Sequence, residues 1–196
     1  MSIPRSDNRL PQLLDEAAHQ FRQKGFRGCS VRDIAGAVRM LPGSLYYHFP
    51  NKEALLVAVY AQGVARISEA VRSAASRQAD PWLRLEAACA AHLEALLDDS
   101  DYAQVVIRVR PQDASRAAAR LTALRDSYDA LFAGLVRALP LPPRTDRRAL
   151  RMLLLGALNW TQTWYRPGRS SPRRIARQFV RLLAEGLRPA ASGGHD

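Results

Sequence analysis

Apolar residues recur three and four positions apart between residues 31 and 49, which is the spacing of one buried helix face. The first set is Val31, Ile34, Ala35 and Val38, and the second set is Leu45 and Phe49. The short stretch between the two sets, residues 39–42, predicts a tight turn. Two short helices joined so closely predict a helix-turn-helix.

The rest of the chain carries the same helical period, and no segment alternates strictly between apolar and polar residues. Prolines and short polar residues mark the breaks, because proline fits the first turn of a helix and short polar side chains cap it. Further helices are predicted over residues 51–77, 81–97, 102–110, 114–139, 146–165 and 172–186. Thr145 and Ser171 are the expected caps of the last two helices. The predicted fold class is all-α, with about nine helices.

The last two predicted helices carry more apolar surface than one body needs to cover itself. Their apolar residues are Leu150, Leu153, Leu154, Ala157 and Leu158, followed by Ile175, Phe179, Leu182 and Leu183. Apolar faces of this extent are typical of protein interfaces. We therefore expect both helices to pair with their copies in a second subunit as a four-helix bundle.

The second helix of the helix-turn-helix has a composition that a buried helix would not choose. Small residues open it and three consecutive hydrogen-bonding rings close it: Pro42, Gly43, Ser44, Tyr46, Tyr47 and His48. Small residues allow the backbone to approach a groove or a phosphate closely. Consecutive rings point in different directions around a helix, so at least one should face solvent or a partner. Lys52 follows at the start of the next helix, where a cation and backbone N–H groups suit a phosphate oxygen.

Residues 9–56 resemble the DNA-binding domain of the TetR family of bacterial one-component transcriptional regulators. The segment GSLYYHF at residues 43–49, followed by Asn51, Lys52 and Glu53, is similar to the family's recognition helix and the start of its fourth helix. The resemblance implies a three-helix domain with an amphipathic first helix, made by Leu10, Leu13, Leu14, Ala17, Ala18 and Phe21. Ser30 would cap the second helix, with Asp33 as its capping-box partner.

The resemblance also implies roles for individual residues. Ser44, Tyr46 and His48 would face the operator, Tyr47 would touch the DNA backbone or base edges, and Lys52 would hold a phosphate. Ser30 and Arg32 would bind the flanking backbone, and Pro42 and Gly43 would bring the helix close to the DNA. Two positions depart from the family pattern: Arg39 stands where glycine is usual in the turn, and Leu41 stands where a small polar residue is usual. A left-handed Arg39 would cost about 1 kcal/mol relative to glycine.

Length and composition set outer bounds on this interpretation. With 196 residues the chain can hold one small and one larger domain. We expect a DNA-binding domain over residues 1–53, an effector-binding and dimerisation domain over residues 54–188, and a disordered tail over residues 189–196. Without a long apolar run or a signal sequence, we expect a cytoplasmic protein. Cys29 and Cys89 are isolated and are expected to be small packing residues, with no metal site or cofactor.

The net charge of +11 lies mostly outside the predicted DNA-binding domain. Residues 141–196 hold eleven arginines against three carboxylates. Many of these arginines gather near the last loop and helix: Arg166, Arg169, Arg173, Arg174, Arg177 and Arg181. They are either a solvated basic face or a dock for an anionic effector.

The segment LNWTQTWYRPGR at residues 158–169 resembles a stretch of TetR regulators that sense coenzyme A thioesters. The resemblance implies an acyl group inside the helical body and nucleotide phosphates beside arginines. The expected inner wall is Leu96, Val106, Tyr128 and Trp160, with His92 and Asn159 as polar anchors and Thr163, Trp164 and Arg166 nearby. Paired tryptophans are also common in cores and interfaces, so another hydrophobic effector is an equal alternative.

No sequence motif points to catalysis, so we expect a regulator and not an enzyme. The expected mechanism is release of a homodimeric repressor from a pseudo-palindromic operator when a small effector binds. One alternative is a regulator of efflux or detoxification that senses a hydrophobic small molecule. Another is a helical adaptor whose basic C-terminal face binds an acidic partner.

Overall fold

The computed structural model describes residues 9–187, which contain nine α-helices, two short 3₁₀ helices and no strand. The helices are α1 (Leu10–Gly28), α2 (Val31–Ala37), α3 (Pro42–His48), α4 (Lys52–Ser76), α5 (Pro81–Leu97), α6 (Asp101–Arg108), α7 (Ala118–Arg137), α8 (Arg147–Trp164) and α9 (Pro172–Gly186). The 3₁₀ helices, η1 (Pro111–Asp113) and η2 (Ser115–Ala117), lie between α6 and α7. The predicted all-α fold class is confirmed.

The chain forms two compact units. One comprises the residues up to 66 together with residues 99–126, and the other comprises residues 67–98 together with the residues from 127 onward. Both α4 and α7 contribute to each unit. The domain boundary expected after residue 53 stays a prediction, and the expected tail, residues 189–196, lies outside the described residues.

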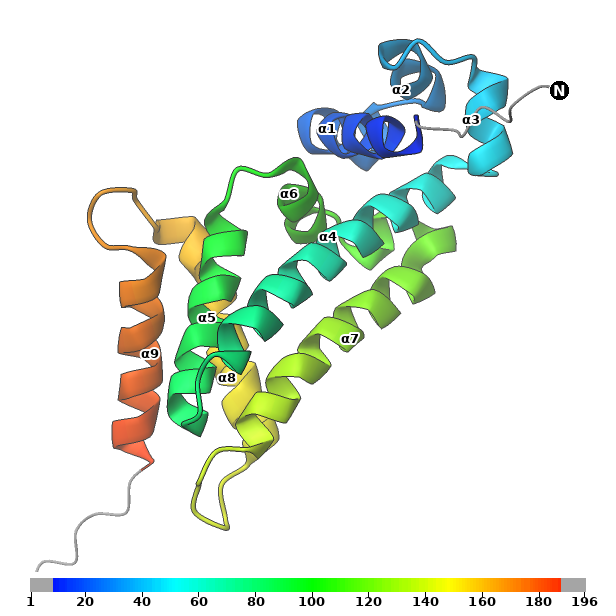
Figure 1. Cartoon of the computed structure of the whole chain (residues 1–196). Helices are drawn as coiled ribbons and strands as arrows, with labels where there is room; N and C mark the ends of the chain where they lie inside the picture. Colours follow the sequence, from blue (N-terminus) through cyan, green and yellow to red (C-terminus); the bar gives the residue numbers. More distant parts are fainter. Residues whose placement is uncertain (1–8, 188–196) are drawn as a thin grey trace, which may run out of the picture. The chain divides into compact units, whose positions relative to one another are not determined.

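Helices α1, α2 and α3, which we call the head, lie together beside the start of α4 (Figure 1). The buried face of α1 consists of Leu13, Ala17, Ala18, Phe21 and Phe26. Leu10 is exposed and Leu14 half-buried, so the apolar face of α1 is narrower than the sequence predicts. A kink at Gly25, where φ is +70°, ends the regular part of α1 and turns Phe26 back onto Phe21.

Two local features shape the helix-turn-helix: the cap at the start of α2 and the turn that follows α2. The Ser30 side chain accepts from the Asp33 N–H and the Asp33 carboxylate accepts from the Ser30 N–H, which is the predicted capping box. Arg39 has a φ of +53°, so it adopts the left-handed conformation that favours glycine, the residue usual at this position in the family. The turn keeps its geometry despite the departure from the family pattern.

Within residues 9–187, α4 is long and apolar enough to cross a membrane by length and composition alone. Core helices of soluble proteins meet the same criterion. The buried residues of α4 recur at helical spacing: Leu55, Leu56, Val59, Tyr60, Val64, Ser68, Val71 and Ala75. This pattern is that of a helix packed along one face inside a protein.

In the second unit α5 packs against both α8 and α9 (Figure 1). Asp80 caps α5 and Ser171 caps α9, so these two helices begin where the sequence predicts. The prediction of Thr145 as the cap of α8 is wrong. Asp146 is the cap instead, because its carboxylate accepts hydrogen bonds from the N–H groups of Arg148 and Ala149.

The segment around α6 and α7 differs from the sequence prediction. α6 begins at Asp101 and ends at Arg108, two residues before the expected end. α7 begins only at Ala118, because η1 and η2 take up the residues before it. The most buried side chains of α7 are Leu121, Phe132 and Val136, followed by Leu139 just after the helix. Leu131 and Leu135 are only half-buried, because their neighbours Phe132 and Val136 take the inward positions.

Candidate functional site

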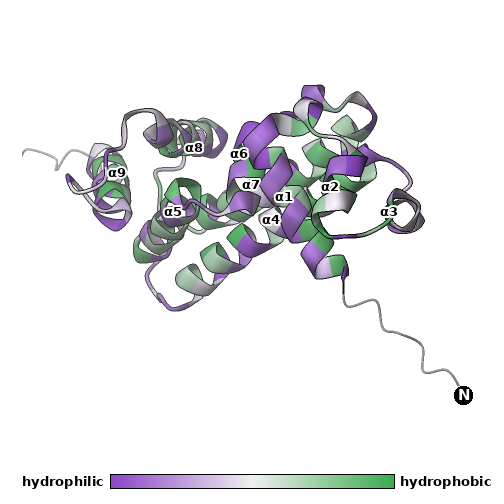
Figure 2. Cartoon of the chain, turned by 90° about the horizontal axis from the view of Figure 1, so that it is seen from above, coloured by the Kyte–Doolittle hydropathy of each residue, from purple (hydrophilic) through white to green (hydrophobic). Residues whose placement is uncertain are grey.

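Helix α3 buries one side chain and exposes most of the others. Leu45 is fully buried and anchors the helix. Tyr47 is 87% exposed and Tyr46 51% exposed, and the small residues Gly43 and Ser44 are exposed as well. Pro42 and His48 are half-buried. In Figure 2, α3 is drawn mostly in pale and purple tones, as expected for a helix with a single hydrophobic anchor. This surface offers two phenol hydroxyls and a hydroxymethyl group for hydrogen bonds.

The start of α2 is a second polar surface of the head. Ser30 and Arg32 are both exposed, as the sequence interpretation requires. The Ser30 hydroxyl accepts from the Asp33 N–H at 3.1 Å, and the Ser30 side chain also hydrogen-bonds to the Asp33 carboxylate. The backbone hydrogen bond from Ser30 holds the pKa of the Asp33 carboxyl below its usual value. The Asp33 carboxylate is therefore committed to the cap.

Lys52 is placed differently from the simple phosphate contact that the sequence suggests. Its Nζ donates to the carbonyl oxygens of Phe26 at 2.7 Å and Cys29 at 2.9 Å. Nζ also lies 4.5 Å from the centre of the Phe26 ring. An ammonium group has three N–H donors, so one remains for a phosphate. Lys52 thus ties α4 to the segment between α1 and α2.

Leu41 was not chosen as a contact residue from the sequence. Its side chain is 76% exposed and lies immediately before α3. An apolar side chain beside a DNA-facing helix can contact a thymine methyl group. The departure of Leu41 from the family pattern was the signal that could have identified it.

Among the predicted effector residues, the structure brings His92 and Tyr128 together. The Tyr128 hydroxyl lies 2.7 Å from His92 Nδ1, and the Phe132 ring meets the imidazole edge-on at a centroid distance of 5.7 Å. Burial lowers the pKa of His92 to about 4, although the nearby Asn159 side chain raises it. Burial raises the pKa of Tyr128, so the phenol keeps its proton.

The second imidazole nitrogen of His92, Nε2, is buried, and no group within residues 9–187 meets it in full hydrogen-bond geometry, although the Asn159 side chain interacts with the imidazole. Because Tyr128 keeps its proton, its hydroxyl can donate to Nδ1, and Nε2 then carries the hydrogen of the neutral ring. A buried donor without an acceptor costs about 1–3 kcal/mol. A ligand atom that accepts this hydrogen would recover that free energy. Phe132, one turn beyond Tyr128, was not among the residues expected from the sequence, because helical spacing does not distinguish it from the neighbouring Leu131.

Asn159, the other predicted polar anchor, hydrogen-bonds to the His92 imidazole through its side chain, but the remaining predicted effector residues are not gathered around His92. Leu96 is buried one turn further along α5, whereas Val106 belongs to the other unit and lies against Gly63. The placement of Trp160 in an inner wall is wrong for the single chain, because its side chain is 66% exposed. Trp164 is 45% exposed, and the remaining residues are exposed as well: Asn159, Thr163 and Arg166.

Trp160 and Trp164 instead belong to an exposed apolar strip on α8. The exposed residues at three- and four-residue spacing are Met152, Leu153, Gly156, Ala157, Trp160 and Trp164. Leu182 is the exposed large apolar residue of α9. The opposite side of α8 buries Leu150, Leu154 and Leu158 inside the unit. The broad apolar face predicted for α8 is therefore divided between the core and the surface.

Several C-terminal arginines are paired with carboxylates. Arg173 Nε lies 2.6 Å from Glu94, and Arg177 Nε lies 3.0 Å from Glu86, so α9 is linked to α5 by two ion pairs. Arg181 pairs with Glu185 along α9 at 2.7 Å. Exposed pairs of this kind contribute little to stability, because solvent screens the two charges. Their geometry explains part of the C-terminal arginine excess by packing within the unit.

Two family models match the chain. The model of the bacterial regulatory proteins of the tetR family matches residues 13–59, and the model of the tetracyclin repressor-like C-terminal domain matches residues 78–187. The HTH-type transcriptional repressor KstR2 of Rhodococcus jostii (strain RHA1) is 30% identical over 187 residues, which cover 91% of each chain.

Solved structures with the same fold include two that are similar over nearly the whole chain. AibR in complex with isovaleryl coenzyme A and operator DNA has a TM-score of 0.73 and 26% identity, with 89% of this chain and 97% of that chain covered. The superantigen PfiT has a TM-score of 0.79 and 29% identity, with 92% of this chain and 97% of that chain covered.

Proposed function

Because the chain belongs to the TetR family of bacterial regulatory proteins, we propose that it is a transcriptional repressor that a small effector releases from operator DNA. The observation that carries this proposal is the exposed surface of α3, with Tyr46 and Tyr47 outward and Leu45 inward. An α-helix fits the major groove, where base edges present distinct patterns of hydrogen-bond donors and acceptors. The family members are regulators and not enzymes, and we place this chain with them in the bacterial cytoplasm.

The proposed DNA contacts divide into reading and positioning groups. Ser44, Tyr46 and His48 face base edges, and Tyr47 reaches the backbone or a base edge. Ser30 and Arg32 hold the flanking phosphates, and the third N–H of Lys52 holds another. Leu41 adds an apolar contact beside α3. Pro42 and Gly43 allow the start of α3 to approach the groove.

TetR-family regulators act as homodimers, and we propose that two copies of this chain pair through α8 and α9. The exposed strip of α8, centred on Leu153 and Trp160, and Leu182 of α9 supply the apolar surface for this contact. Pairing would remove these side chains from water, at about 25 cal/mol per Å² of apolar surface. A two-fold dimer presents two recognition helices and therefore reads a pseudo-palindromic operator.

For the effector, we propose a largely apolar molecule that carries a hydrogen-bond acceptor. The unpartnered Nε2 of His92 supports this class, because a carbonyl oxygen would accept its hydrogen. A neutral imidazole offers no charge to a buried carboxylate, which favours an ester, thioester or ketone over a free acid. AibR, which binds isovaleryl coenzyme A, makes an acyl-CoA thioester the first class to test.

The expected roles of Trp164, Thr163 and Arg166 toward a coenzyme A group stay predictions. A regulator of efflux that senses another hydrophobic molecule could use the same anchor, His92. The two alternatives therefore differ only in the chemical class of the effector that releases the DNA. The adaptor alternative is less well supported, because Arg173 and Arg177 are paired with glutamates of α5.

The DNA-binding proposal is tested by substitution at Tyr47. Because its side chain is exposed, Tyr47→Ala should leave the thermal stability unchanged and weaken binding to a selected duplex by about tenfold, the equivalent of about 1.4 kcal/mol. Tyr47→Phe, which removes only the hydroxyl, should have a smaller effect. Leu83→Ala, at an exposed position of α5, is the control and should bind as the wild type does. Wild-type affinity in a Tyr46→Ala, Tyr47→Ala double variant would exclude α3 as the reading helix.

A further inference from the structure

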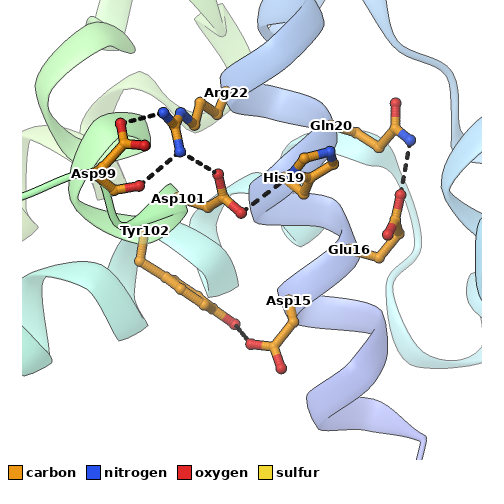
Figure 3. A network of polar contacts seen from close by, with 8 residues as sticks. All are labelled: Asp15, Glu16, His19, Gln20, Arg22, Asp99, Asp101 and Tyr102. Atoms are coloured by element: carbon orange, nitrogen blue, oxygen red, sulfur yellow. Dashed lines mark hydrogen bonds and ion pairs between the residues drawn. The ribbon is translucent and has the colours of Figure 1, made fainter.

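The start of α6 is joined to α1 by a dense group of polar contacts (Figure 3). Arg22 Nη1 donates to Asp101 Oδ1 at 3.0 Å and to the backbone carbonyl oxygen of Asp99 at 2.6 Å. The other terminal nitrogen of Arg22 pairs with the Asp99 carboxylate. Arg22 therefore uses both arms of its guanidinium on a three-residue segment.

Two further contacts lie on the same face of α1. His19 Nδ1 lies 3.2 Å from Asp101 Oδ2, and the Tyr102 hydroxyl donates to Asp15 Oδ1 at 2.8 Å. Positions 15, 19 and 22 are four and three residues apart, so they form one stripe along α1. We call these six residues the α1–α6 clasp: Asp15, His19, Arg22, Asp99, Asp101 and Tyr102.

The clasp is more than a set of solvated surface pairs. Arg22 and Asp101 keep only 20% and 29% of their side-chain surface exposed. The hydrogen bond to Asp101 raises the pKa of Arg22, and burial together with the bond to Asp15 raises the pKa of Tyr102. Arg22 therefore stays charged and Tyr102 keeps its proton at neutral pH.

The opposite side of α6 is held against α4. A Cβ atom placed at Gly63 would lie 2.9 Å from the Tyr102 carbonyl oxygen and 2.7 Å from Val106 Cγ2, so only glycine permits this approach. The Arg66 guanidinium lies 4.1 Å from the centre of the Tyr102 ring. Tyr102 is thus fixed by α1 through its hydroxyl and by α4 through its ring and backbone.

We propose that Arg22 and Asp101 are positioning residues for DNA binding, which fix the head on α6 so that α3 is held ready for its half-site. This inference rests on the proposed DNA-binding function. α1 packs on α2 and α2 packs on α3, so a constraint on α1 is passed to the reading helix. A head that is fixed before binding loses less conformational freedom when both half-sites are occupied.

If Arg22 instead contacted a phosphate directly, the Asp101→Asn substitution would change DNA affinity in the opposite direction. Removing a carboxylate from a DNA-binding surface should strengthen binding if only charge matters. The clasp predicts weaker binding, because Asp101→Asn deprives Arg22 and His19 of their charged partner. The two explanations therefore differ in the sign of a single substitution.

The experiment measures binding to a duplex that the wild-type protein selects from a random-sequence pool. Arg22→Gln, Asp101→Asn and the double variant should each bind about tenfold more weakly, the equivalent of about 1.4 kcal/mol. The double variant should bind about as weakly as either single variant, and the two effects should not multiply, because both substitutions remove the same contact. The salt dependence of binding should stay that of the wild type, since no phosphate contact is lost.

Arg173→Gln is the matched control, because it removes the same charge from an ion pair outside the clasp. Tyr102→Phe keeps the packing and removes one hydrogen bond, so it should weaken binding by a smaller factor even if a charge variant folds poorly. Wild-type or stronger binding by Asp101→Asn, or a smaller salt dependence in Arg22→Gln, would overturn the inference. Failure of the wild type to select any duplex would instead overturn the proposed function.

Discussion

At the scale of single residues, His92 shows how burial sets the chemistry of a side chain. Its imidazole is enclosed by Tyr128 and Phe132, and within residues 9–187 no group meets its Nε2 in full hydrogen-bond geometry. The sequence predicts His92 in the interior, as a polar anchor of the effector site. It could not show which nitrogen is satisfied, since that depends on a tyrosine 36 positions away.

The low pKa of His92 predicts a loss of stability in mild acid. Between its unfolded pKa of about 6.5 and its folded value of about 4, the unfolded chain binds a proton that the folded chain does not. The free energy of unfolding should therefore fall as the pH drops from 6.5 to 4, by as much as about 3 kcal/mol. Denaturant unfolding across this range checks it. His92→Gln should show a flatter profile, and parallel profiles of the two proteins would contradict the assignment.

Two residues of the head show what the sequence predicted at this scale and what it could not. The sequence identified Arg39 as the position where a left-handed conformation would be costly, and the structure shows that Arg39 adopts it. The sequence could not show the carbonyl partners of Lys52, because they belong to Phe26 and Cys29, which only the tertiary fold brings to α4.

At the scale of helices, boundaries marked by a proline behind a short polar cap were predicted correctly. α5 and α9 start and end where the sequence indicated. The start of α8 was misplaced by one residue, because Thr145 and Asp146 are both good caps and only the geometry decides between them. The start of α7 was missed because alanines before Ala118 favour a helix, whereas the two 3₁₀ turns do not follow from composition.

The α1–α6 clasp had no signature in the sequence. Neither Asp99 nor Asp101 was singled out in the sequence. Their partners on α1 lie 77 and 79 positions away, and such pairing follows from the tertiary fold and not from any local pattern. The interface that fixes the head was therefore visible only in the structure.

The close approach of α6 to α4 gives a prediction at the same scale. Gly63→Ala should lower the free energy of unfolding by about 1–3 kcal/mol, because the new methyl group would overlap the Tyr102 backbone as well as a movable valine side chain. Gly134→Ala is the control, because a Cβ there meets no atom within 4 Å. Chemical denaturation of both variants checks the difference. Equal stability of Gly63→Ala and Gly134→Ala would show that α6 does not pack on Gly63 as described.

At the scale of the whole molecule, the charge and the apolar surface have different explanations. Part of the C-terminal arginine excess is paired with glutamates: Arg173 and Arg177 join α9 to α5, and Arg181 pairs with Glu185 along α9. The apolar strip on α8 has no partner within its own unit and fits the homodimer of the family. The sequence predicted that surplus of apolar surface correctly, but it placed Trp160 in the interior, because periodicity does not distinguish a core from an interface.

The central claim is that two copies of this chain read DNA with α3. Selection of duplexes from a random-sequence pool by the purified protein, followed by sequencing, tests it most directly. We expect a pseudo-palindromic consensus whose half-sites lie about one helical turn, or a multiple of it, apart, as two-fold symmetry requires. Enrichment should disappear in the Tyr46→Ala, Tyr47→Ala variant. A pool that stays random with the wild-type protein would contradict the account.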